Sequence, residues 1–103
     1  MNNAETRLYS IRTTDVPCAV ALLCENDAVR LSADIVGEDR KGNPELEWTI
    51  GHPTPGRMEE LKAAHEADLN GLMVPSRLYD RIKGLVIMAD IRRAREGHLR
   101  RRA

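Results

Sequence analysis

The sequence has few aromatic residues and no long apolar segment. Its 103 residues include one Trp, two Tyr and no Phe, so the core must be built mainly from aliphatic side chains, Met and Ala. The longest uncharged apolar run, Val16 to Cys24, covers nine residues, whereas a membrane-spanning helix needs about 20. Residues Met1 to Glu5 also lack the basic and apolar segments of a secretory signal. We therefore expect a cytoplasmic protein with no membrane partner.

Cysteine is also scarce, and its spacing argues against cross-links and metal sites. Cys18 and Cys24 are the only cysteines, and six residues of helix would separate them by about 9 Å, too far for a disulfide. There is no Cys-x-x-Cys motif, and His52, His65 and His98 are too far apart in sequence to give metal-ligand spacing. We expect two buried free thiols, a reducing compartment, and no cofactor or metal.

A net charge of one sign is absent as well, but the charges are unevenly distributed. Sixteen basic residues balance 16 acidic ones over the whole chain. Residues 92–103 nevertheless hold six arginines and one glutamate, a local charge of +5, so the remainder of the chain is acidic. With 42% hydrophobic and 31% charged residues, the composition predicts a single globular domain over 1–97 and a basic C-terminal tail over 98–103.

Alternation with a period of two over residues 29–50 is the clearest structural signal. It predicts two strands of an antiparallel hairpin, each with one buried face, joined by the polar loop 37–44. An alternative is one long helix over 15–38, because apolar residues there also recur at helical spacing, which would give a mainly α bundle. The apolar positions of the two alternating stretches are Val29, Leu31, Ala33, Ile35, Leu46, Trp48 and Ile50.

Helices are predicted on both sides of this hairpin. A short strand is expected over 6–13, followed by a helix that begins near Asp15. Two C-terminal helices are predicted over about 56–70 and 76–96, because each has an apolar stripe, a favourable start and a glycine just past its end. The predicted fold class is therefore α+β: a small antiparallel sheet packed by the two C-terminal helices.

No group of residues forms a catalytic constellation. No histidine has a catalytic partner in the sequence around it, and Glu45 and Glu47 are typical of the solvent face of a strand. Gly37, Gly42, Gly51 and Gly56 lie in predicted turns and lack the spacing of a phosphate-binding loop. We predict a protein that is not an enzyme, and a small hydrolase or isomerase built around His52 or His65 is the third hypothesis.

The segment Leu85 to Ala89 is apolar on every side of a helix, and such a segment packs on more than one side. We predict that one side binds another protein or a second subunit. The chain would then be a small modulator or inhibitor that alters the assembly or activity of its partner, acting as a homo-oligomer. The residues predicted to form the interface are Leu85, Val86, Ile87, Met88, Ile91, Tyr79 and Trp48.

The alternative function is a nucleic-acid-binding regulator that uses the basic C-terminus. A cluster of arginines is the electrostatic signature of phosphate binding. The acidic remainder of the chain would repel a phosphate backbone, and no aromatic residue near the arginines offers a stacking platform. The residues predicted for this function are Arg92, Arg93, Arg95, Arg100, Arg101 and Arg102.

Overall fold

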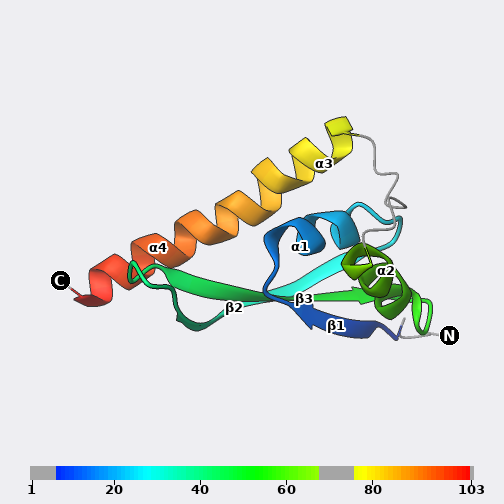
Figure 1. Cartoon of the computed structure of the whole chain (residues 1–103), viewed down its shortest axis with the longest axis horizontal. Coiled ribbons are helices and arrows are strands. Elements are labelled where there is room, and N and C mark those ends of the chain that lie inside the picture. Colours follow the sequence, from blue (N-terminus) through cyan, green and yellow to red (C-terminus); the bar gives the residue numbers. More distant parts are fainter. Residues whose placement is uncertain (1–6, 68–75, 103) are drawn as a thin grey trace, which may run out of the picture.

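A computed structural model describes residues 7–67 and 76–102. The elements are β1 (Tyr9–Thr13), α1 (Val16–Leu23), β2 (Val29–Glu38), β3 (Pro44–His52), α2 (Arg57–Glu66), α3 (Ser76–Ile82), a π-helical turn η1 (Lys83–Ile87) and α4 (Met88–Arg102). The strands form one antiparallel sheet in the order β1-β3-β2. One face of the sheet is covered by α1 and by the continuous helical rod from α3 to α4 (Figure 1). This architecture confirms the predicted α+β class.

The alternative of one helix over 15–38 is wrong, because the chain turns between α1 and β2. Cys24 caps α1, and the turn residues Glu25-Asn26-Asp27 follow it. Asp27 has a φ of 69°, a left-handed conformation that Asp tolerates better than most residues and that a helix cannot continue through. Strand β2 then pairs with β3 as the predicted hairpin.

The prediction that β2 buries one continuous apolar face is wrong. Leu31 and Val36 are extra residues in the ladder, because the register with β3 shifts at both positions. Paired residues share a face, so Ile35 lies on the helix side with its partner Leu46, whereas Val29 lies on the opposite side. Little covers this strand, and its large apolar side chains are between 41% and 52% exposed: Val29, Leu31, Ile35 and Val36.

The two C-terminal helices differ from their predicted ranges. Helix α2 ends at Glu66. The predicted stop signal and linker of that helix, within 68–75, lie outside the described residues. The predicted helix over 76–96 contains the π turn and continues through Gly97 to Arg102, so most of the predicted tail is helical. His98 Nε2 lies 2.5 Å from Glu38 Oε2, so this extension of the helix contacts the end of β2.

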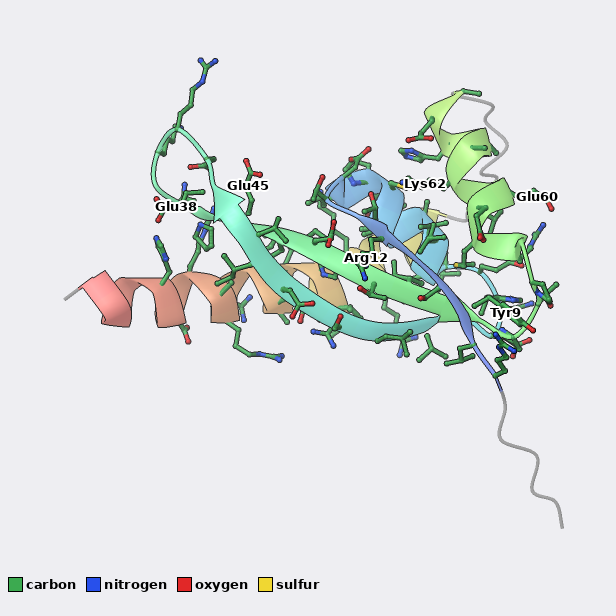
Figure 2. The ribbon with its side chains drawn as sticks, turned by 90° about the horizontal axis from the view of Figure 1, so that it is seen from below. Tyr9, Arg12, Glu38, Glu45, Glu60 and Lys62 are labelled. Atoms are coloured by element: carbon green, nitrogen blue, oxygen red, sulfur yellow. The ribbon has the colours of Figure 1, made fainter. Side chains whose placement is uncertain are left out.

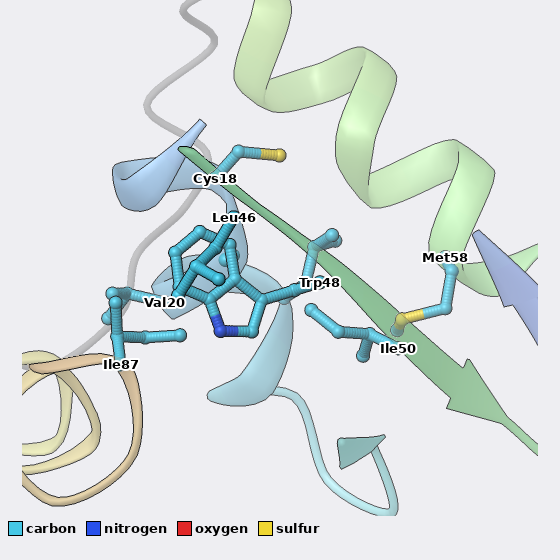
Figure 3. Packing of buried hydrophobic residues seen from close by; sticks show 9 residues of the cluster. Cys18, Val20, Leu46, Trp48, Ile50, Met58 and Ile87 are labelled. Atoms are coloured by element: carbon cyan, nitrogen blue, oxygen red, sulfur yellow. The ribbon is translucent and has the colours of Figure 1, made fainter. Parts of the chain in front are cut away.

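The core lies between the sheet and the helices, with Trp48 at its centre. Figure 3 shows the Trp48 indole enclosed by Val20 of α1, Leu46 of β3 and Ile87 of η1. Met58 of α2 extends the same cluster toward the β1 side. A core of aliphatic side chains, Met and a single Trp is the composition that the scarcity of aromatic residues predicts.

Candidate functional site

The π turn determines which side of the last helix meets the core. The Met88 N–H donates to Lys83 O, five residues earlier, instead of the four residues of an α-helix. Ile82 and Ile87, also five apart, therefore both contact the core cluster. Between them Leu85 is turned outward and is 68% exposed, whereas Ile87 is fully buried.

The structure separates the predicted interface residues into three groups. Ile87 and Trp48 lie in the core, so the prediction that they contact a partner is corrected: the apolar segment packs on the sheet through Ile87. Leu85 and Met88 are exposed. The remaining three are partly buried against the core cluster: Val86, Ile91 and Tyr79. Only Leu85 and Met88 of the predicted set thus form an open apolar surface.

A buried carboxylate, Asp90, joins α4 to two strands. Arg30 of β2 donates from Nε to Asp90 Oδ2 at 2.7 Å and from Nη2 to Oδ1 at 2.8 Å. The Trp48 indole N–H donates to the same Oδ2 at 3.0 Å. The Asp90 side chain is 5% exposed and that of Arg30 33%. This bidentate pair fixes the rotation of α4 over the sheet. The sequence signal for it was a single acid in the apolar stretch that runs from Leu85 to Ile91.

A groove lies between β2 and the helical rod, because α4 packs mainly over β3. It consists of two adjoining cavities of about 220 Å³ each, both bounded by Arg30, Asp90 and Arg93. Apolar side chains complete it, with Ile35 at one end and Leu85 at the other. On the other side of α4 a cavity of about 380 Å³ has Trp48, Ile91, Asp39, Glu45 and Arg95 in its walls.

The arginines predicted for nucleic-acid binding lie on α4. Arg92, Arg93 and Arg95 are exposed there, and Arg93 makes no ion pair among the described residues. The helix carries the backbone of 100–102, but the side chains of Arg100, Arg101 and Arg102 lie outside the described residues. The structure thus brings three predicted arginines onto one helix, with Arg93 beside the groove and Arg95 beside the cavity on the other side of α4.

The histidines that sequence analysis considered as catalytic bases have other contacts. In the Nε2–H tautomer, His52 donates to the Asn26 carbonyl at 2.8 Å while its Nδ1 accepts from the Thr54 N–H at 3.0 Å. This buried ring therefore ties the loop before β2 to the loop after β3. His65 is partly buried on α2. Among residues 7–67 and 76–102, no group of three or more His, Cys, Asp or Glu could hold a metal ion.

The partly buried Glu25 and the exposed Asp39 have lowered pKa values for local reasons. Arg57 Nε donates to Glu25 Oε2 at 2.8 Å, and this bond lowers the pKa of Glu25 below its ordinary value. In the β2–β3 loop, the Asn43 N–H, 2.9 Å from Asp39 Oδ1, and the Lys41 N–H hold the pKa of Asp39 below its ordinary value. Both groups organise turns at the ends of the hairpin.

Both cysteines are free thiols, as predicted. Cys18 is buried and Cys24 partly buried, and this burial raises the pKa of each thiol. The thiolate, which is the reactive form, is therefore depleted at neutral pH.

The two thiols are expected to react at different rates with an alkylating reagent at mildly alkaline pH. Cys24 should be modified first, and Cys18 at least about 100-fold more slowly than in the unfolded chain, because it requires an opening of the core. Peptide mass spectrometry over time measures both rates. In denaturant the two rates should converge, and equal rates in the native protein would contradict the burial of Cys18.

Comparison of the chain with protein-family models, with curated proteins and with solved structures finds no match. No helix in the described part of the chain combines the length and hydropathy needed to cross a membrane. The structure itself shows a small α+β domain with an open strand edge and a basic last helix.

Proposed function

We propose that this chain is a protein-interaction module that binds another protein through the exposed start of its last helix. The observation that carries the proposal is the 68% exposure of Leu85, in a helix whose neighbouring residues pack on the core. Met88 lies one turn further along and is also exposed. Single exposed apolar residues are ordinary, but Leu85 also borders the groove, and exposed apolar residues at a groove are typical of binding surfaces.

The surroundings of Leu85 support a contact that is both apolar and oriented by charge. Arg93 borders the groove next to Leu85 and has no carboxylate partner among the described residues. Apolar contacts would supply affinity, and the arginines would orient an acidic partner. Occlusion of the partner's own assembly or active surface is then the mechanism by which the chain modulates it.

Leu85→Asp is expected to lower the affinity for the captured partner at least about tenfold while the chain stays folded. The measurement is capture from cell extract on the immobilised chain, followed by titration of the purified partner. Ala63→Asp, on the exposed side of α2, is the matched control and should bind as the unmodified chain does. Undiminished binding by Leu85→Asp would contradict this surface.

The second candidate function, nucleic-acid binding, is favoured by the exposure of Arg92, Arg93 and Arg95 on α4. A nuclease-treated sample of the same extract separates the two functions. Recovery that survives nuclease supports a protein partner, whereas recovery that nuclease removes and that falls steeply with salt supports the basic helix as a phosphate-binding element.

A further inference from the structure

The edge strand β2 leaves backbone groups and apolar side chains uncovered. It is ten residues long, and in the described part of the chain it pairs with β3 alone. Its large apolar side chains are about half exposed, and Figure 2 shows the strand along the open border of the sheet. Folded proteins usually shorten such an edge, charge it heavily or cover it.

We propose that a second copy of this chain covers the edge, with the two β2 strands paired antiparallel about a two-fold axis. The proposal does not depend on the helix surface at Leu85. The two sheets would then form one six-stranded sheet, with the helices of both copies on the same face. An axis of this kind makes each contact occur twice, which is the usual way a chain associates with itself.

The charges along β2 favour the second copy over another occupant. Arg30 lies toward one end of the strand, and Asp34 and Glu38 lie toward the other. Antiparallel pairing brings Glu38, which lies on the helix side of the sheet like Arg30, toward the basic end of the other copy, where Arg93 borders the groove; Asp34 lies on the opposite face.

The bulges limit where the strands can pair. Between the extra residues Leu31 and Val36 the register with β3 is regular over 32–35. An axis through Ala33 places two small side chains opposite each other on the helix side and sets Ser32 opposite Asp34 of the second copy on the other side. An axis through the next residue, Asp34, would place Asp34 against Asp34, which like-charge repulsion disfavours.

The experiment is a measurement of molar mass by sedimentation equilibrium over a concentration series of the full chain. We expect a mass approaching twice 11.6 kDa. Ile35→Lys and Val36→Lys should each weaken the dimer at least about tenfold, because a cation replaces an apolar contact in the paired strands, close to the axis at Ala33. Ser10→Lys, which is exposed on the other edge strand β1, is the control and should leave the dimer unchanged. Circular dichroism confirms that each variant is folded.

A cysteine cross-link tests the register. Ala33→Cys should form a disulfide-linked dimer under mild oxidation, because opposite Cβ atoms in antiparallel strands are about 5 Å apart. Ser10→Cys should not form a cross-linked dimer. The unmodified chain is oxidised in parallel to measure any cross-linking through the native thiols.

Three results would overturn the proposal: a monomer at every concentration, a dimer that both lysine variants leave intact, or a cross-link at Ser10→Cys in place of Ala33→Cys. A monomer whose β2 amides become protected only when another protein is added would assign the edge to that protein and also overturn it. Because Leu85→Asp tests the helix and Ile35→Lys tests the strand, the proposed function and this proposal can fail separately.

Discussion

Ile87→Asp is expected to abolish the folded state. The Ile87 side chain has no exposed surface and contacts the core around Trp48 (Figure 3). An aspartate there would bury a carboxylate with no cationic partner, near the Asp90 carboxylate one turn away. The cost, about 4 kcal/mol or more, approaches the lower end of the stability range of about 5 to 15 kcal/mol of a folded domain. Far-UV circular dichroism and urea unfolding monitored by Trp48 fluorescence measure the loss.

Two matched variants separate burial from charge. Ile87→Val keeps the contact apolar and should cost only about 1 kcal/mol. Leu85→Asp, two residues earlier on the exposed side, should change stability by about 0.5 kcal/mol or less, as is usual at the surface. A folded Ile87→Asp protein with near-normal stability would show that this residue does not belong to the core.

Asp90→Ala is expected to give the next largest loss, about 3 kcal/mol. The substitution removes the acceptor of three hydrogen bonds at once, and leaves the Arg30 guanidinium and the Trp48 N–H without their partner. Because the Arg30 side chain is one-third exposed, water can solvate it in part, so the loss should fall at the lower end for a broken buried pair. Urea unfolding measures the free energy, and a shift in Trp48 emission reports on the indole.

A double-mutant cycle with Arg30→Ala isolates the pair. If the bidentate contact stabilises α4 on the sheet, the free energy of unfolding lost in the double variant will be smaller than the sum of the two single losses. The difference, which is the coupling energy of the pair, should be about 1 kcal/mol or more. Arg30→Ala should cost less than Asp90→Ala, because the remaining Asp90 keeps the Trp48 bond. Additive losses would contradict the coupling that the geometry implies.

The hairpin was predictable because alternation and turn residues are local signals. The pattern from Val29 to Ile50 gave the pairing partners and the α+β class. It did not give the two bulges, since an extra residue in a ladder depends on the partner strand and on the helices above it. The exposure of β2 was therefore missed, together with the candidate edge that it forms.

In the last helix, too, some features follow from the local pattern and others are set only by tertiary contacts. The apolar run from Leu85 to Ala89 predicted an interface that includes Ile87, whereas Ile87 lies in the core. Periodicity cannot say which side of an all-apolar segment faces the core. The π turn at Lys83–Ile87 sets that rotation. Local pattern cannot reveal the role of Asp90, because an acid in a helix is ordinarily exposed and its two donors come from strands about 40 to 60 residues earlier.

The sequence by itself determined the elements, the hairpin pairing, the aliphatic core around one Trp, the free thiols and the basic end of the chain, because these depend on local spacing and composition. Tertiary structure alone decided that Ile87 and Trp48 are interior, that Leu85 and β2 are open, and that Asp90 is paired with Arg30. Those outcomes depend on the position of α4 over β3, which contacts between segments far apart in the chain fix.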